Sequence, residues 1–163
     1  MVHEHAMIFC LQINEHMCRC VAGNHNFVLQ VKTICGSNDD ACLKNMNAIC
    51  TAPENRKLIL GTQSGVVCIS RNGDIIWTFG TGHGVASVDS RRGLVYAAVE
   101  EEKRVLILDQ HGQPLVQNVF PAGCTISAPS RVAVGKACLI VREFVHHDQQ
   151  GLKSMVHVFT LSF

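Results

Sequence analysis

Four short stretches of the chain carry side chains that could do chemistry, and the first lies near the N-terminus. His16-Met17-Cys18-Arg19-Cys20 offers one imidazole and two thiols, the side-chain types that bind zinc. Structural zinc sites usually place about two to four residues between paired cysteines, whereas Cys18 and Cys20 are separated by a single residue. On a strand, His16 and both cysteines would share one face, which leaves a partnered site geometrically open. We expect ordinary strand residues and no metal.

The other three stretches match catalytic motifs only loosely. Gly80-Thr81-Gly82-His83-Gly84 is glycine-rich, but a phosphate-binding loop precedes a helix, and we expect this run to join two strands. Glu100-Glu101-Glu102 with Lys103-Arg104 could form an acidic clamp on a substrate, although mixed charges at a hairpin tip are usually solvated. His146-His147-Asp148 could bind a metal or act as acid and base, but neighbours in one loop rarely converge. We therefore predict no catalytic residue, no metal and no cofactor.

Composition and charge narrow the class of protein. The 163 residues are 47% hydrophobic and 17% charged, which suits one domain of strands with buried faces. The net charge is +1 and the cations are not clustered, so a nucleic-acid partner, RNA included, is disfavoured. No apolar run approaches the roughly 20 residues of a membrane helix, and we expect no membrane partner.

The nine cysteines do not indicate a disulfide framework. Cys10, Cys50, Cys68 and Cys138 fall within apolar runs, where a thiol behaves as a small hydrophobe. The count is odd, and Met1-Val2-His3-Glu4-His5 lacks the basic region and cleavage site of a signal peptide. The prediction is a cytoplasmic protein with reduced thiols.

The strands and turns that would position these residues belong to a repeated sequence pattern, which we call the cassette. The cassette occurs at Arg56–Gly80, Arg91–Phe120 and Arg131–Phe163. The first copy contains three short apolar strands and two tight turns. Its second turn carries Asn72-Gly73, the strongest short-range hairpin signal. The next copy keeps this order, with Gln110-His111-Gly112-Gln113 at the second turn. Such a repeat predicts a series of similar small sheets.

One more short apolar stretch comes before the first cassette, at Ala48–Ala52, and before the second, at Val85–Asp89, and Val132–Gly135 introduces the third. We predict that these are the innermost strands, because their small side chains suit close approach around a central channel. Gly73 and Gly112 are 39 residues apart, close to the roughly 40–45 residues of a four-stranded propeller blade. The predicted fold is therefore all-β, a β-propeller of about four blades, and a β-sandwich is the alternative.

The repeat is less regular at both ends of the chain. Residues 1–46 form a divergent N-terminal β unit, and residues 47–163 hold the blades, together as one continuous domain. The elements expected in the first unit are strands at Ala6–Ile13, Met17–Ala22 and Phe27–Val31 and one loose helical turn at Ala41–Met46. The last cassette has strands at Ala137–Phe144 and Val156–Leu161, a long polar turn between them, and no fourth strand. The propeller is incomplete unless an N-terminal strand fills the vacant edge, and an incomplete ring is expected to self-associate.

The second cassette resembles an NHL repeat. Gly93–Ala98 matches the glycine–aliphatic–tyrosine strand of that family, Arg104–Asp109 its Arg-Val strand, and Asp109–Gly112 its Asp-x-x-Gly turn, with Val85–Asp89 as the inner strand. The family usually has an Asp/Ser-Gly-Asn-Asn turn where this chain has Val99–Glu102. The resemblance covers residues 47–163. It implies a propeller of the type that forms the C-terminal recognition domain of tripartite-motif (TRIM) proteins.

The first cassette is also similar to the tryptophan-docking repeat of quinoprotein-like propellers, through Gly65–Ile69, Asn72-Gly73 and Trp77. The quinone-binding enzymes of that group need a vicinal Cys-Cys pair, which this sequence lacks, so no quinone cofactor is implied. The TRIM-type resemblance implies recognition of a substrate protein or an RNA. The Cys/His spacings of RING and B-box modules are missing, so ubiquitin transfer is not implied.

We predict a non-enzymatic interaction module whose turns form a docking scaffold for a protein partner, such as the substrate-recognition part of a ubiquitin-ligase-type protein. The alternatives are a propeller hydrolase or lactonase with a channel metal, and an RNA-binding NHL-type domain. A channel metal needs several polar side chains on the inner strands, where Asp89 is the only acid. Rim turns are also expected at Gln63-Ser64 and Cys124–Ser130. The partner-binding residues predicted on rim turns are Asn24, His25, His83, Glu101, Lys103, Arg104, His146, His147 and Lys153.

Overall fold

The computed structural model describes residues 16–22, 25–31, 46–52, 56–70, 73–147 and 151–161, and these residues form strands and turns without a helix. The chain divides into two units, Met1–Ser37 and Asn38–Phe163, which we describe separately. All strand pairs are antiparallel. Within these ranges we find no helix with the length and apolar character needed to cross a membrane.

The described residues of the first unit form one hairpin. Strand β1 (His16–Ala22) pairs with β2 (His25–Val31) over seven residue pairs. These two strands include the strands predicted at Met17–Ala22 and Phe27–Val31. The strand predicted at Ala6–Ile13 lies outside the described residues, as does the predicted helical turn apart from its last residue, Met46, which begins β3.

The described residues of the second unit form three sheets. In each sheet, strands that follow one another in the sequence are neighbours. The first sheet consists of β3 (Met46–Ala52), β4 (Lys57–Thr62), β5 (Gly65–Ile69) and β6 (Ile75–Gly80). The second consists of β7 (Val85–Arg91), β8 (Leu94–Val99), β9 (Arg104–Leu108) and β10 (Pro114–Val116). The third has three strands, β11 (Pro129–Val134), β12 (Cys138–His147) and β13 (Gly151–Thr160). The predicted cassettes therefore correspond to successive sheets.

The turns before β6 and β10 share one backbone pattern, and each places its glycine at a positive φ. Gly73 N–H donates to Ser70 O at 3.1 Å, and Gly112 N–H donates to Asp109 O at the same distance. The φ angles are 95° and 81°, a region that glycine enters without steric cost. In the second turn, backbone N–H groups, that of Gln113 first, hold the pKa of the Asp109 carboxyl below its usual value.

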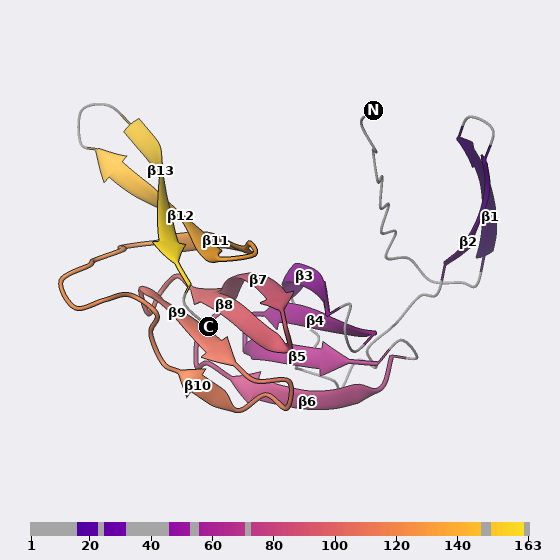
Figure 1. Cartoon of the computed structure of the whole chain (residues 1–163), viewed down its shortest axis with the longest axis horizontal. Helices are drawn as coiled ribbons and strands as arrows, with labels where there is room; N and C mark the ends of the chain where they lie inside the picture. Colours follow the sequence, from indigo (N-terminus) through magenta and orange to yellow (C-terminus); the bar gives the residue numbers. More distant parts are fainter. Residues whose placement is uncertain are drawn as a thin grey trace. The chain divides into compact units, whose positions relative to one another are not determined.

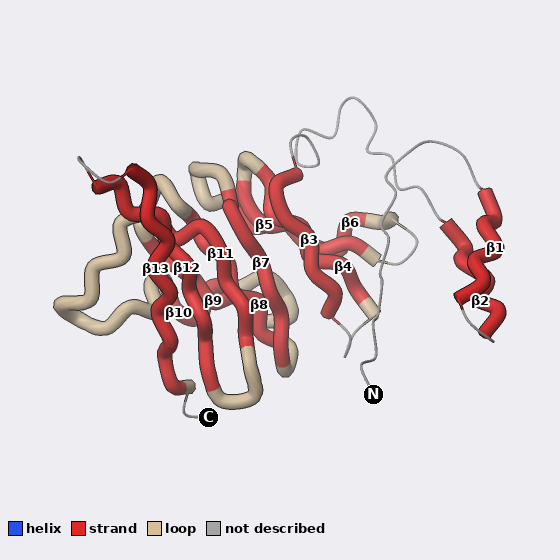
Figure 2. The backbone as a smooth tube through the Cα atoms, turned by 90° about the horizontal axis from the view of Figure 1, so that it is seen from above, coloured by secondary structure: helices blue, strands red, loops and turns tan. Residues whose placement is uncertain are grey.

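The first strands of the three sheets lie next to one another, as Figures 1 and 2 show. Strands β3 and β4 contact β7, and β7 and β8 in turn contact β11. The second sheet is thus enclosed between the other two, and its strands β8 and β9 are mostly buried. The described strands do not close into a ring.

Polar groups of β7 connect all three sheets. Ser87 Oγ accepts the N–H of Val132 at 3.2 Å, and Asp89 Oδ2 accepts the N–H of Val134 at 2.7 Å. On the other side, Ser90 Oγ donates to the carbonyl oxygen of Thr51 at 2.7 Å. The inner strands are therefore held together by hydrogen bonds as well as by apolar contacts.

Two apolar clusters fill the spaces between the sheets. The cluster between the first and second sheets is made of buried side chains from β4, β5, β7, β8 and β9: Ile59, Val66, Cys68, Val85, Val88, Val95, Ala97, Val99, Leu106 and Leu108. The cluster between the second and third contains Tyr96, Ala98, Val105, Ile126, Val132, Leu139 and Val141. Adjacent residues of β8, such as Ala97 and Ala98, thus enter opposite clusters. This is why the strand has a continuous apolar sequence.

The described cysteines behave as small hydrophobes. Cys50, Cys68, Cys124 and Cys138 are free thiols, and Cys68 is fully buried. Burial raises the pKa of the Cys50 thiol to about 12, so this group stays protonated at neutral pH. The strand placement predicted for Cys50, Cys68 and Cys138 is confirmed, whereas Cys10 lies outside the described residues.

Trp77 of β6 joins the first sheet to the second. Its indole Nε1 donates to the carbonyl oxygen of Gln110 at 2.9 Å, in the turn before β10. The ring covers Gly112, where a Cβ atom would lie 2.7 Å from two ring carbons. The turn therefore needs glycine at this position for two reasons, its φ angle and the closeness of the ring.

The third sheet differs from the prediction in the length of its last two strands. We predicted a long polar turn between Phe144 and Val156, but β12 and β13 pair continuously from Cys138–Thr160 to His147–Gly151. His146 and His147 therefore belong to β12, and Lys153 belongs to β13. The polar turn signal was misleading because an antiparallel hairpin tolerates polar side chains wherever one face meets solvent. The absence of a fourth strand from this sheet, in the part of the chain that the structure describes, agrees with the prediction.

Candidate functional site

Three turns of the first two sheets surround an open cleft of about 550 Å³. They are the β4–β5 turn, the loop between β6 and β7, and the β8–β9 turn. The residues that line this rim cleft are Asn47, Gln63, Gly82, His83, Gly84, Ala86, Glu100 and Glu101. Polar and acidic groups dominate this lining, in contrast to the apolar clusters between the sheets.

The β4–β5 turn has a rigid base. The buried Thr62 Oγ1 donates to Gly65 O at 3.0 Å and accepts the N–H of Ser64 at 3.3 Å. Gly65 has φ +148°, and a Cβ atom there would lie 2.0 Å from Phe79 O, so only glycine fits. Ser64 O also accepts the N–H of Thr81 at 3.2 Å, which ties this turn to the β6–β7 loop.

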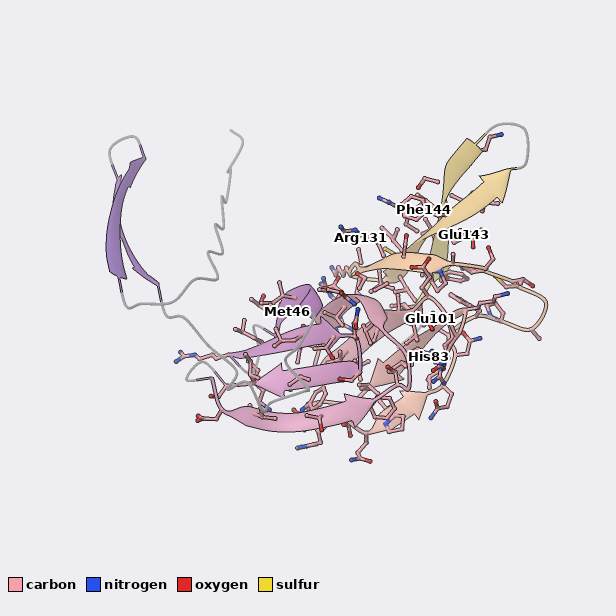
Figure 3. All side chains as sticks on the ribbon, turned by 180° about the vertical axis from the view of Figure 1, so that it is seen from behind. Met46, His83, Glu101, Arg131, Glu143 and Phe144 are labelled. Carbon is pink, nitrogen blue, oxygen red and sulfur yellow. The ribbon has the colours of Figure 1, made fainter. Side chains whose placement is uncertain are left out.

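His83 and Glu101 meet at the cleft from different turns. His83 Nδ1 lies 2.7 Å from Glu101 Oε2, and Figure 3 labels both side chains, which lie close together. The Thr81 hydroxyl donates to the backbone carbonyl of His83 and so supports the loop. The side chains of the pair are 48% and 69% exposed, and an ion pair in such solvent contributes little to stability. The pair is therefore available to a ligand.

Lys103 and Arg104 stabilise the β8–β9 connection through different contacts. Lys103 has φ +55°, and its N–H donates to Glu100 O at 3.0 Å. Arg104 forms an ion pair with Glu102 and donates to Gln117 Oε1 at 2.9 Å. Arg104 is thus directed to Glu102, and the acidic residues that line the cleft are Glu100 and Glu101.

A backbone irregularity recurs beside the cleft. In each first strand, the pairing register shifts at the second residue, which is Asn47 in β3, Ala86 in β7 and Ser130 in β11. Such bulges redirect side chains near binding sites. Asn47 and Ala86 line the rim cleft, and Asn47 Nδ2 donates to Val85 O at 3.3 Å. Asn47 was not predicted as a site residue. The only indication in the sequence was its position at the start of a predicted innermost strand.

The structure brings together some of the predicted rim residues and separates others. His83 and Glu101 line the same cleft, Lys103 lies in the same β8–β9 turn as Glu101, and Arg104 begins β9. Of the other predicted residues in the second unit, His146 and His147 lie in β12 and Lys153 lies in β13. His25 belongs to β2 of the first unit, and Asn24 is outside the described residues.

Groups that could support catalysis are scarce in the described chain. No group of three or more His, Cys, Asp or Glu side chains is placed to hold a metal ion among the residues with described side chains. Asp89 accepts the N–H groups of Val134 and Ser90, so this acid of the inner strands has a structural role. A second hollow, of about 10 Å³ beside Trp77 and Arg92, has room for about one water molecule.

No protein-family model matches the chain, and no curated protein matches it. The resemblance to NHL and quinoprotein-like repeats rests on the sequence motifs alone and stays a prediction.

Proposed function

We propose that this protein is a non-enzymatic interaction module that binds a protein partner at the rim cleft. The observation that supports this most directly is the convergence of His83 and Glu101, from different turns, on an open and polar cleft on rigid strands. Asn47 and Gln63 line the same cleft.

We propose further that the three sheets are consecutive blades of an incomplete β-propeller of the NHL type. Three features support this fold: the strand order within each sheet, the contact between first strands, and the bulge at Asn47, Ala86 and Ser130. The contact of Trp77 with the Gly112 turn of the next sheet also supports it, because the similar quinoprotein-like repeats carry a docking tryptophan. The module would then be the recognition part of a ubiquitin-ligase-type assembly.

The charges of the cleft define the chemistry of the partner. Glu100 and Glu101 line the cleft, and Arg104 is paired with Glu102. A carboxylate surface attracts Lys and Arg side chains and repels phosphate groups. The partner is therefore a protein segment with basic residues, and RNA is disfavoured. A hydrolase with a channel metal is disfavoured by the engagement of Asp89 with backbone N–H groups.

Selection from a displayed peptide library on the immobilised full-length chain tests this proposal. We expect peptides that contain Lys or Arg. We expect Glu101→Gln to weaken the binding of a selected peptide roughly 10- to 100-fold, because a charge-assisted hydrogen bond contributes about 1.5–3 kcal/mol. The matched control is Asp74→Asn, which neutralises an exposed acid in the turn before β6 and should leave the affinity unchanged. Selection of peptides without basic residues, or equal losses in both variants, would contradict the proposal.

A further inference from the structure

Two arginines lie directly opposite one another on the third sheet. Arg131 of β11 is the register partner of Arg142 of β12. Their neighbours along the strands, Val132 and Val141, are buried in the cluster toward the second sheet. Because successive side chains of a strand point to opposite faces, Arg131 and Arg142 share the face directed away from the second sheet, which we call the outer face.

Nothing described on the outer face balances these two charges. Like charges directly opposite one another destabilise a sheet, because their Cβ atoms are only about 4.5–5.5 Å apart. Neither arginine forms an ion pair with a carboxylate of the described residues. Glu143 is the only acid within residues 129–147 and 151–160, and Figure 3 labels it together with Arg131. Glu143 is buried on the opposite face, where it accepts the N–H of Ser127 at 3.0 Å.

The guanidinium of Arg142 is held in place by its own sheet. Its Cζ atom lies 4.3 Å from the centre of the Phe144 ring, a cation–π contact between side chains of the same face. Its Nε atom is buried, so the group lies along the sheet. Ser130 Oγ donates to the backbone carbonyl oxygen of Arg142 at 3.2 Å and fixes β11 to β12 at this point. A guanidinium fixed in this way loses less conformational entropy when it binds a ligand.

From these features we infer that Arg131 and Arg142 bind one oxyanion, a carboxylate or a phosphate group, that is carried by a protein segment. Guanidinium groups form their strongest hydrogen bonds with these two groups, because both donor and acceptor are charged and their geometries match. An anion between the two arginines also removes the repulsion between them.

The surroundings of the two arginines favour a protein segment over a nucleic acid. Arg142 lies opposite Val156, which is 61% exposed, and Val158 beside it is 67% exposed. Arginine next to exposed apolar side chains is typical of protein interfaces, whereas a nucleic acid is held by many phosphate contacts. Among the described strands of the third sheet, alternation places no other Arg or Lys on the outer face.

This inference goes beyond the proposed function and is independent of it. The rim cleft is lined by residues of the first two sheets, and it attracts basic groups. The outer face belongs to the third sheet, and it attracts acidic groups. An experiment can therefore remove either site without changing the other.

Nuclear magnetic resonance of the ¹⁵N-labelled full-length chain, titrated with inorganic phosphate, tests the anion site. We expect the side-chain Nε–H signals of Arg131 and Arg142 to shift together and saturate. Arg131→Gln should weaken this binding roughly 10- to 100-fold, because charge-assisted hydrogen bonds are lost. The matched control, Arg56→Gln, neutralises an exposed arginine just before β4 and should leave the affinity unchanged. Signals that do not saturate, or equal losses in the two variants, would overturn the inference.

Synthetic peptides identify the source of the oxyanion. The probes are the peptide Gly-Leu-Glu-Leu-Gly, the same peptide with phosphoserine in place of glutamate, and the same peptide with glutamine there as the uncharged control. The tighter of the two charged peptides shows whether the site takes a carboxylate or a phosphate group. If neither binds better than the glutamine peptide, or if a single-stranded oligonucleotide binds more tightly than both, the inference is wrong.

Arg131→Glu separates binding from a purely structural role. This variant replaces two opposed like charges by an attractive pair with Arg142, so it should unfold at a temperature roughly 1–4 °C higher while it loses the response to phosphate. An arginine that serves packing alone would give a lower unfolding temperature and an unchanged response. That result would contradict the assignment of Arg131 to an anion site.

Discussion

Gly112 shows how one residue joins two elements of the second unit. Its backbone has φ +81°, and Trp77 of the first sheet lies where a side chain would be. We expect Gly112→Ala to destabilise the protein by roughly 2–4 kcal/mol, since left-handed strain and displacement of the indole each cost about 1–2 kcal/mol. Thermal unfolding followed by circular dichroism measures this effect.

The control for this variant is Gly123→Ala. Gly123 has φ +86°, and a Cβ atom there would meet nothing within 4 Å. The control therefore carries the backbone strain without the steric contact, and its loss of stability should be smaller. Equal losses in the two variants would show that the Trp77 contact is not structurally important.

The predicted site residues show which features of the cleft can be inferred from the sequence and which cannot. His83 and Glu101 were predicted because loop and turn residues carry function on β scaffolds. Their distance of 2.7 Å could not be predicted, because it depends on how the β6–β7 loop meets the β8–β9 turn. The lining residue Asn47 was missed because a β-bulge is a property of strand pairing, and residue type indicates it only weakly.

At the scale of elements, the contact between β7 and β11 depends on a buried hydroxyl. Ser87 Oγ accepts the N–H of Val132, and both residues are buried. We expect Ser87→Ala to cost about 1–3 kcal/mol in the free energy of unfolding, because the N–H then stays buried without an acceptor. Chemical denaturation measures the change. Ser127→Ala alters an exposed residue and should change the stability by less than about 0.5 kcal/mol; a similar loss in both would contradict this account.

The strands of the first two sheets were predictable, and those of the third were less so. Gly73 and Gly112 mark turns whose geometry requires glycine, so the turns before β6 and β10 followed from the sequence. The end of β12 and the start of β13 carry His146, His147 and Lys153, which look like turn residues. Strand pairing outweighed this local preference, because a hairpin gains backbone hydrogen bonds at every second residue whatever the side chain.

At the scale of the whole molecule, the repeat predicted successive antiparallel sheets, and the structure contains three in the second unit. It did not predict whether the sheets close, because closure depends on contacts between sheets that are distant along the chain. The described sheets do not close into a ring, and residues of the first two sheets line the rim cleft.

Nuclear magnetic resonance of the ¹⁵N-labelled full-length chain, titrated with a selected basic peptide, tests the central proposal most directly. If the partner binds at the rim cleft, the amide signals of Gln63, His83 and Glu101 shift together and saturate with the peptide, while those of β13 stay in place. Shifts confined to β13 or to the innermost strands, with the three cleft signals unchanged, would contradict the account.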